Sequence, residues 1–347
     1  MRKLATLRKI DSIRPIEGAD AIEAAVIGGW TVVVKKQEFA AGDIVIFLEI
    51  DSWVPHEIAP FLTKAGDEPR EYKGVKGERL RTVKLRGQLS QGLLLKPTLF
   101  ESVMQLLGRE GRKAFEADLS EMLGVQKWEP PLDLVKTAFV RGNFPSEIRK
   151  TDQERVQNLV REVFETPANQ EAEYEITVKL DGSSMTVYRM GDEIGVCSRN
   201  QNLKLDQDGN QFVNAARACG ILEKLADLHQ NIAIQGELMG PGIQGNREGL
   251  DEHTFFVFDI WSIDEQRHLA GAERRAICEN LGLRHVPVIN ERVSLKLLGL
   301  TDVEKMLAFA DGPSLNNKIR EGVVFKRCDG GFSFKAISNK FLLKGGN

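Results

Sequence analysis

The chain reads Val178-Lys179-Leu180-Asp181-Gly182-Ser183-Ser184 where a run of alternating apolar residues, begun at Tyr174, comes to its end. This alternation predicts a half-buried β-strand that stops at a turn. A nucleophilic lysine needs an apolar support for its stem, nearby charge that favours the free amine, and a glycine that lets a bulky ligand approach. The stretch supplies all three. Because a lysine-x-aspartate-glycine string also arises by chance, the interpretation depends on the rest of the sequence.

Length and composition favour two domains. The 347 residues suffice for two hydrophobic cores. The formal net charge of −3 excludes a bulk polycation but allows a local basic face. The four cysteines form no C-x-x-C pair and lie away from the histidines, so we expect reduced thiols rather than a zinc site. We find neither a signal-peptide core nor an apolar stretch of membrane length, and expect a cytoplasmic protein without a membrane partner.

The N-terminal half alternates short β-rich runs with turn residues. Strands are expected at 25–27, 30–34, 44–50, 80–85 and 92–95, which indicates a small barrel. Helical stretches are expected over 99–107 and 113–123. Basic residues crowd one short span of this half: Arg70, Lys73, Lys76, Arg79, Arg81, Lys84 and Arg86. They suit either a groove that follows a nucleic-acid backbone or an ordinary solvated surface.

Two proline-containing breaks, Trp128-Glu129-Pro130-Pro131 and Asn143-Phe144-Pro145, separate the halves. We place the boundary near residue 140, giving domains 1–140 and 141–347. The second half mixes strands with helices expected at 152–164, 211–228, 272–281 and 301–310. The fold class is therefore α+β.

Several strand ends in the second half carry polar groups. Arg199 suits a grip on phosphate or ribose, or is a surface arginine. Glu237 follows an apolar strand and a glycine; it could hold a ribose hydroxyl or a metal-bound water, or cap a turn. Asp259 interrupts the aromatic run 255–261, and a buried unpaired acid suggests a site.

The last polar groups lie near the C-terminus. Strand alternation puts Glu321 and Lys326 on opposite faces, and Lys335 on the face opposite Phe332 and Phe334. The order along the chain is lysine, arginine, glutamate, aspartate, glutamate, lysine, which chance does not readily produce.

This order resembles the covalent nucleotidyltransferases, the superfamily of DNA ligases, RNA ligases and messenger-RNA capping enzymes. The matching strings are Lys179-Leu180-Asp181-Gly182, Ser198-Arg199-Asn200, Gln235-Gly236-Glu237-Leu238, Phe258-Asp259, Glu321-Gly322-Val323-Val324 and Lys335. Within the superfamily, Ile148-Arg149-Lys150-Thr151-Asp152 and Phe334-Lys335-Ala336-Ile337-Ser338-Asn339-Lys340-Phe341 resemble the fifth family of ATP-dependent RNA ligases. That resemblance implies an N-terminal OB-type β-barrel followed by a two-sheet nucleotidyltransferase (adenylation) domain.

The chain departs from the family pattern at two positions. Several RNA ligases have a second lysine two residues after the one that matches Lys335, whereas this chain has Ile337. Lys326 and Lys340 are both candidates to supply that charge. Ser184 stands where some RNA ligases have an asparagine.

The resemblance implies that Lys179 attacks ATP, that AMP becomes attached to Lys179, and that a 5′-phosphate then receives the AMP before a 3′-hydroxyl seals the strand. The implied catalytic group is Lys179, Lys335, Asp181 and Glu321. The implied nucleotide contacts are Arg199, Glu237, Phe258 (with Phe256 as a rival), Gly182, Lys326, Arg155 and Gln157. Mg²⁺ or Mn²⁺ would be held, largely through water, by Asp181, Glu237, Glu321 and Asp259.

The implied substrate is a nicked duplex with RNA on the 3′-hydroxyl side, and we expect a monomer. Two alternatives stay within the enzyme class: an ATP-dependent DNA ligase and a GTP-using capping guanylyltransferase. A third, from a different class, is a non-catalytic OB-domain nucleic-acid-binding protein. Labelling by ATP, by GTP or by neither nucleotide separates these readings.

Overall fold

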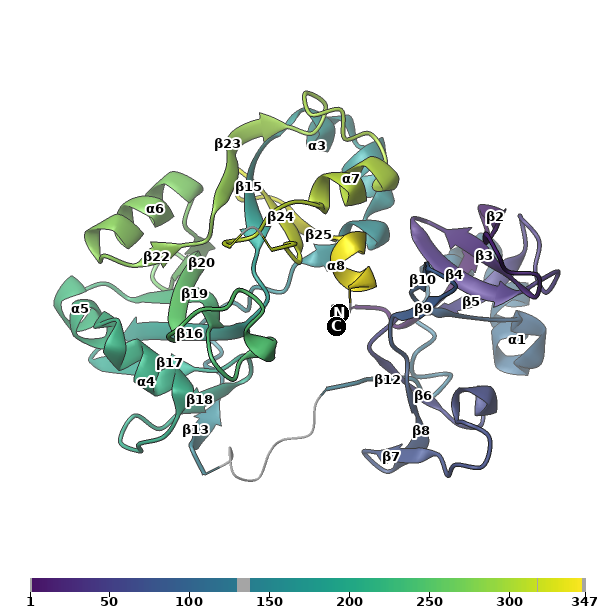
Figure 1. The fold of residues 1–347 in the computed structure, drawn as a ribbon, viewed down its shortest axis with the longest axis horizontal. Coiled ribbons are helices and arrows are strands. Elements are labelled where there is room, and N and C mark those ends of the chain that lie inside the picture. Colours follow the sequence, from purple (N-terminus) through teal and green to yellow (C-terminus); the bar gives the residue numbers. More distant parts are fainter. Residues whose placement is uncertain (1, 130–137, 317, 345–347) are drawn as a thin grey trace. The chain divides into compact units, whose positions relative to one another are not determined.

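A computed structural model describes residues 2–129, 138–316 and 318–344. The chain divides into two compact units, one of Met1–Pro131 with Leu342–Asn347 and one of Leu132–Phe341 (Figure 1). Within the described ranges, no helix combines the length and apolar character needed to cross a membrane.

Short strands build the N-terminal unit. One sheet has the order β1 (Ala5–Lys9), β5 (Ile44–Leu48), β11 (Leu93–Leu95), and a meander joins β2 (Ser12–Pro15), β3 (Ile22–Ile27), β4 (Trp30–Lys35). A third sheet has the order β12 (Gln126–Lys127), β6 (Ser52–Pro55), β8 (Val75–Arg79), β7 (Arg70–Tyr72), and a hairpin pairs β9 (Val83–Leu85) with β10 (Gln88–Ser90). The helical segments are η1 (Pro60–Leu62), η2 (Pro97–Leu99), α1 (Glu101–Glu110) and η3 (Gly111–Glu116).

Strand β5 is the centre of this unit because both of its faces are buried. Val45 and Phe47 pack into one apolar cluster with Trp30, while Ile46 and Leu48 pack into another. The second cluster is closed by α1. Such a strand reads as a continuous apolar run rather than an alternating one, as residues 44–48 do.

The predicted strands of this half are largely present, but the helix expected over 113–123 is wrong. The chain leaves α1 at Gly111, whose φ of 55° ends the helix, and continues as a 3₁₀ turn over Gly111–Glu116. Of the strand expected at 80–85, only β9 forms.

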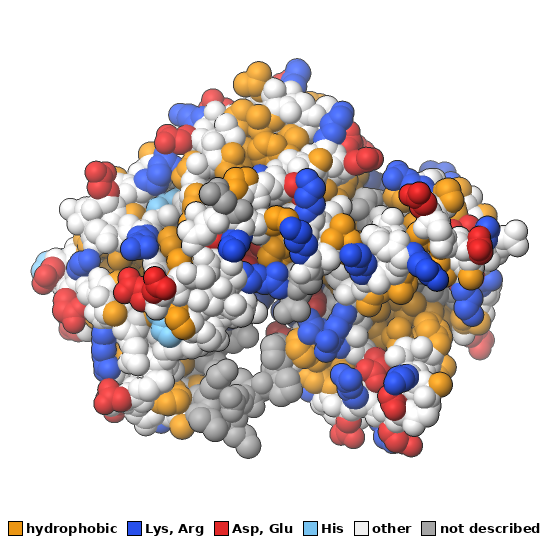
Figure 2. All heavy atoms as spheres, viewed as in Figure 1, with side chains coloured by type: hydrophobic (Ala, Val, Ile, Leu, Met, Phe, Trp, Pro, Cys, Tyr) orange, Lys and Arg blue, Asp and Glu red, His pale blue; other side chains and the backbone are white. Residues whose placement is uncertain are grey.

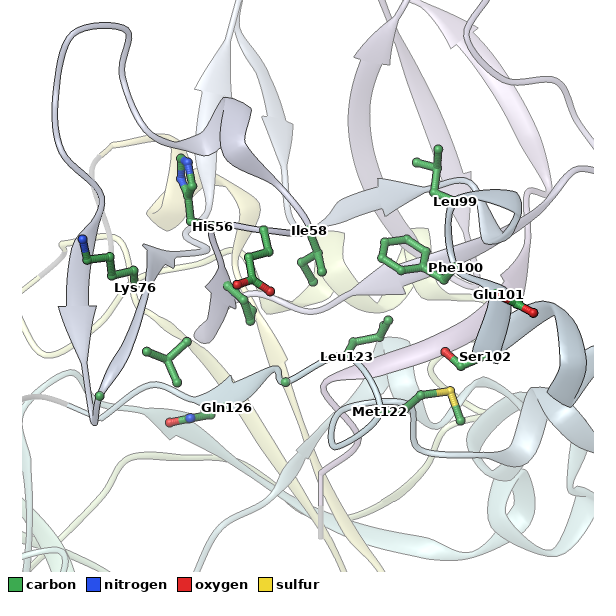
Figure 3. Close-up of a pocket in the computed structure, with 15 residues that line it drawn as sticks. His56, Ile58, Lys76, Leu99, Phe100, Glu101, Ser102, Met122, Leu123 and Gln126 are labelled. Atoms are coloured by element: carbon green, nitrogen blue, oxygen red, sulfur yellow. The ribbon is translucent and has the colours of Figure 1, made fainter.

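The N-terminal unit also holds a cavity of about 1010 Å³. It lies between the start of α1 and strands β6 and β8, and its lining includes His56, Ile58, Lys76, Phe100 and Met122 (Figure 3). Its lining residues all belong to this unit.

Two antiparallel-rich sheets form the second unit. The larger has the order β13 (Val140–Asn143), β18 (Gln201–Leu203), β17 (Glu193–Cys197), β16 (Ser183–Met190), β19 (Ile232–Met239), β20 (Thr254–Ser262), β21 (Arg267–His268), with β22 (Arg284–His285) also paired to β20. The smaller has the order β14 (Glu154–Arg155), β25 (Ser333–Ile337), β24 (Gly322–Arg327), β15 (Glu173–Lys179), β23 (Val288–Ser294).

Helices cover one face of each sheet. The larger sheet packs against α4 (Gln211–Ala218) and α5 (Ile221–Leu228), and the smaller against α7 (Val303–Ala310). The remaining helical segments are η4 (Val156–Asn158), a π-helix η5 (Arg161–Glu165), α3 (Pro167–Glu171), η6 (Gln244–Asn246), α6 (Gly271–Asn280) and α8 (Asn339–Leu343). A small apolar cluster that includes Val178, Leu180, Met239, Phe256 and Val286 joins the two sheets.

The helix predictions for this half fare unevenly. Those at 272–281 and 301–310 correspond to α6 and α7. The one at 211–228 is split at Gly220, which has a φ of 65°. The one at 152–164 is wrong, because residues 154–155 instead add a parallel edge strand to β25. Edge pairing and irregular turns here override the helical periodicity.

Gly77 gives a test of the packing in the N-terminal unit. A Cβ atom there would lie 2.2 Å from the Val54 carbonyl oxygen, whereas one at Gly108, inside α1, meets nothing within 4 Å. Gly77→Ala should lower the free energy of unfolding by about 1–3 kcal/mol through overpacking. Gly108→Ala should raise it by up to about 1 kcal/mol through helix propensity. Urea denaturation followed by tryptophan fluorescence measures both, and equal midpoints for the two variants would contradict the register of β6 and β8.

Candidate active site

Register places three lysines on one face of the smaller sheet. Lys179 pairs with Gly322, and Lys335 pairs with Val324, which in turn pairs with Thr177. Lys326 pairs with Glu175 on the same face. The alternate residues, including Tyr174, Ile176 and Phe325, fill the core beneath α7. The sheet therefore turns its apolar face to α7 and its charged face away from it.

Lys179 ends β15 among carboxylates. Its Nζ lies 2.5 Å from Oε2 of Glu321, the residue before β24, and both side chains are mostly buried. Burial alone would lower the pKa of Lys179, but the charges of Glu321, Glu237 and Asp181 outweigh burial and raise it. Lys179 is therefore a charged ammonium in the free protein.

Glu237 reaches the same cluster from the larger sheet. Its Oε1 accepts a hydrogen bond of 3.0 Å from the Gly182 amide. A Cβ at Gly182 would lie 2.5 Å from the Leu238 carbonyl oxygen, so glycine is required by the neighbouring strand itself. The sequence argument assigned this glycine only to ligand approach.

The carboxylates of this cluster crowd one another. Burial and the charge of Glu321 raise the pKa of Glu237 to about 7, although Lys179 opposes this. Burial and Glu321 likewise raise the pKa of Asp181 to about 6. A divalent cation would relieve exactly this excess of negative charge.

Arg247 was missed by the sequence reasoning. It lies in the loop after β19, and its Nε is 3.2 Å from Asp181 Oδ2. The available signal was the glycine spacing of Gly240-Pro241-Gly242-Ile243-Gln244-Gly245, which marks a tightly turning loop directly after Glu237.

Lys335 and Arg155 stand side by side on the smaller sheet, paired in a parallel register. Burial, followed by the charges of Lys179 and Arg155, lowers the pKa of Lys335 to about 8. Gln157, two residues after Arg155, is buried, and its Oε1 accepts no hydrogen bond from any residue that the structure describes. Orphaned buried acceptors are uncommon, so Gln157 marks a position where a ligand donor would fit.

Lys326, Phe258 and Asp259 form a different group. Lys326 Nζ donates to the Phe258 carbonyl oxygen and to Asp259 Oδ2, each at 2.7 Å. The β19–β20 register jumps so that Gln235 pairs with Asp259 and Gly236 with Val257, which leaves Phe258 as a bulge residue. Phe256 and Phe258 both pack with the small cluster between the sheets.

Asp259 belongs to a buried ionic network. Arg274, 1% exposed, donates to Glu175 of β15, and its Nε donates to His285 Nε2 at 2.9 Å. Its Nη1 lies 3.8 Å from Asp259 Oδ1. Burial opposes ionisation of Asp259, yet Lys326, His268 and Arg274 together lower its pKa. The structure therefore does not bring Asp259 together with Asp181, Glu237 and Glu321.

The network fits closely against the N-terminus of α6. Arg275 also donates to Glu175, and a Cβ at Gly271 would lie 2.4 Å from Glu175 Oε1. Burial and Arg274 lower the pKa of His285 to about 4, so the ring is neutral, and its Nδ1 lies 2.6 Å from the Val286 carbonyl oxygen. A neutral ring with Nδ1 protonated leaves Nε2 free to accept from Arg274.

Arg199 forms its ion pair at the surface of the protein. Its Nη2 is 2.9 Å from Asp152 Oδ1, and both side chains are more than half exposed. Lys340, exposed as well, lies 3.3 Å from Asp311 Oδ2.

An OB-type unit followed by a two-sheet unit, with a buried lysine among three carboxylates where the sheets meet, defines a nucleotidyltransferase of the ligase type. A model of the RNA ligase family matches residues 172–337, and an OB-fold domain model matches residues 4–98. A search of curated proteins gave no match.

Solved structures extend the likeness over the whole chain. Naegleria gruberi RNA ligase with PPi is 45% identical, with 99% of each chain covered and a TM-score of 0.85. A mutant of that ligase with AMP and Mn gives the same values, and another with ATP and Mn is 44% identical over 99% of each chain with a TM-score of 0.83. The chain belongs to the RNA ligase family.

Arg274 gives a test of the buried network. Arg274→Met should lower the free energy of unfolding by about 3–5 kcal/mol, because Glu175 and Asp259 would keep their charges without this partner. Arg292→Met is the matched control, since Arg292 pairs with Glu173 while 68% exposed. Arg292→Met should lower the free energy of unfolding by about 1 kcal/mol or less. Denaturant unfolding of the full chain measures both, and similar losses would refute the network's role.

Proposed function

We propose that this chain is an ATP-dependent RNA ligase of the fifth RNA ligase family. It seals 3′-hydroxyl/5′-phosphate nicks in duplexes, with RNA preferred on the 3′-hydroxyl side, through AMP bound covalently to Lys179, and it acts as a cytoplasmic monomer. The observation that carries this proposal is Lys179 paired with Glu321 beside Asp181 and Glu237. The similar ligases hold ATP, AMP and PPi, which are the substrate of such a first step, the group that it transfers and the product that it releases.

In the first step, the Lys179 amine attacks the α-phosphorus of ATP, the bond to the bridging oxygen breaks, and pyrophosphate leaves. The amine must lose a proton first, because the carboxylates hold it charged in the free protein. Asp181, Glu237 and Glu321 would hold a divalent cation that offsets their charge, and the charge of Lys335 would then favour the neutral form of Lys179. Lys335 also offsets the charge of the α-phosphate.

A divalent ion fits the carboxylate side of the site. Asp181, Glu237 and Glu321 are hard oxygen donors with more negative charge than Lys179 balances. In the described part of the chain, no three acidic, histidine or cysteine side chains are placed to hold a metal directly. Mg²⁺ or Mn²⁺ would be held mainly through its own water and would neutralise charge on the phosphates.

The nucleotide's other contacts follow from burial. The aromatic rings of Phe258 and Phe256 offer an apolar support for adenine, and the unsatisfied Gln157 oxygen suits an adenine amino group. Glu237 would hold a ribose hydroxyl. Lys326 is committed to Asp259 and the Phe258 carbonyl, so it fixes the aromatic strand rather than a phosphate.

Two further steps join the strands. An oxygen of the nick's 5′-phosphate attacks the AMP phosphorus and releases Lys179. The 3′-hydroxyl then attacks the 5′-phosphate and expels AMP. Arg199, which is exposed and pairs with the exposed Asp152, suits the incoming 5′-phosphate better than the ribose.

The first domain, residues 1–140, would bind the duplex. Of its basic stretch, six side chains are exposed: Arg70, Lys73, Lys76, Arg81, Lys84 and Arg86. Arg79 is not available, because it pairs with Asp51 at 2.6 Å and stacks on Trp128. Figure 2 shows Lys and Arg side chains of this unit standing beside hydrophobic surface, an arrangement that suits nucleic acid.

Covalent labelling tests the nucleophile. Wild-type protein incubated with α-labelled ATP and a divalent cation should keep the label through denaturing electrophoresis, and Lys179→Met should keep none. Lys179→Met should still seal a pre-adenylated nick, since only the first step needs the amine. Label from GTP instead would indicate a capping enzyme, and no label from either nucleotide would favour a non-catalytic binding protein.

Strand preference is tested with matched nicks. A nick with one ribonucleotide at the 3′-hydroxyl end should be sealed at least about tenfold faster than its all-deoxy counterpart, if the 2′-hydroxyl is sensed by hydrogen bonding. Single-turnover sealing of pre-adenylated nicks measures the ratio. Equal rates would make the chain a general polynucleotide ligase.

A further inference from the structure

The loop that carries Arg247 adopts a strained backbone. Gln244, Gly245 and Asn246 have φ values of 44°, 68° and 45°, three successive left-handed residues. This conformation is unfavourable for residues other than glycine, and less so for asparagine than for glutamine. Strain of this kind persists only where the surroundings hold it, and it clusters at functional sites.

Side chains hold the loop in place. Asn246 Nδ2 donates to the Leu250 carbonyl oxygen at 2.8 Å, and Asn246 Oδ1 accepts from the Leu250 amide at 3.0 Å. The buried Glu248 accepts from the Asn316 amide, and its carbonyl accepts from the Asn316 side chain. The loop is thus a built element that sets the position of the residue between these anchors.

That residue is Arg247. Its guanidinium lies 4.7 Å from the centre of the Phe341 ring, and its side chain is 33% exposed. Nε meets Asp181 Oδ2, two residues after the nucleophile. An arginine that stacks on an aromatic ring and keeps solvent access has its planar donor fork fixed in direction.

Two separate groups of cations lie around Lys179. Lys179 and Arg155 both act on Lys335, while Arg247 and Glu248 both act on Asp181. The first group suits the α-phosphate, because Lys335 is near the attacking amine. Arg247 comes from the other sheet and supplies a cation next to the carboxylate that a metal would claim.

We propose that Arg247 is a phosphate-binding residue for a phosphate other than the α-phosphate, and that it exchanges Asp181 for that phosphate's oxygens. This rests on the proposed function. Where a metal's water shell would engage Asp181, the guanidinium would turn from that carboxylate to the oxygens of the phosphate. Two sources share this chemistry: the β- and γ-phosphates of ATP, and the 5′-phosphate of the nick.

Calorimetric binding to the full-length Lys179→Met protein separates these sources, since no covalent step intervenes. If the source is ATP, Arg247→Gln should weaken the binding of ATP and of inorganic pyrophosphate by about tenfold or more in the presence of Mg²⁺. The affinity for AMP should be unchanged. If the source is the nick, the loss should appear for a 5′-phosphorylated nick and not for its 5′-hydroxyl counterpart. Arg247→Lys should recover only part of the affinity, because a point charge lacks the bidentate fork.

Arg292→Gln, in an exposed pair on the same unit, is the matched control and should leave every affinity unchanged. If the affinities for ATP, AMP and both nicks fall equally, Arg247 only anchors the loop and the inference is overturned. Unchanged affinities for all of these ligands would also overturn it. If the Lys179→Met parent binds neither ATP nor a nick, the proposed function itself fails, and this inference fails with it.

Discussion

Charges buried between the two sheets of the larger unit determine how those sheets meet. Arg274 touches Glu175 on β15 of the smaller sheet and His285 on β22, and it approaches Asp259 on β20 of the larger. A buried ion pair is seldom the most stable way to fill a core, since apolar residues of equal volume often do better. The network instead fixes the orientation of the side chains that it joins. It fixes Lys326, and through Lys326 the bulged strand that presents Phe258, so the apolar wall and the lysine face keep one geometry.

The cluster around Lys179 has the opposite character, because its charges do not balance. Three carboxylates outweigh the lysine they surround, and the pKa values of Glu237 and Asp181 rise accordingly. In the network near Arg274, by contrast, the pKa of Asp259 falls. The charge of Asp259 is balanced by cations of the protein, whereas Asp181 and Glu237 lie where negative charge is in excess. This difference separates a carboxylate with a structural role from carboxylates that suit a bound cation. Sequence order does not reveal that Asp259 pairs with Lys326 and His268.

Much of the site could be read from the sequence because strands have a period of two. Alternation gave the face of Lys335, and the end of the apolar run gave the position of Lys179 at the tip of a strand. Strand alternation does not predict which side chains meet in the tertiary structure. The bulge at Phe258 depends on register with β19, the edge strand at 154–155 depends on β25, and Arg247 reaches Asp181 only because its loop is turned by left-handed residues. The helix expected at 152–164 does not form for the same reason, because residues 154–155 pair with the open edge of the sheet at β25.

The free protein holds the key cations of its proposed chemistry in internal pairs: Lys179 with Glu321, Arg247 with Asp181, and Arg199 with Asp152. A ligand that brings only negative charge would compete with these carboxylates for the cations and leave the acids crowded. A metal ion alone would offset the charge of the acids but not that of the cations. A nucleotide phosphate together with a divalent ion satisfies both sets at once. The pairing therefore favours joint binding of the two, and the carboxylates keep the lysine protonated in the free protein.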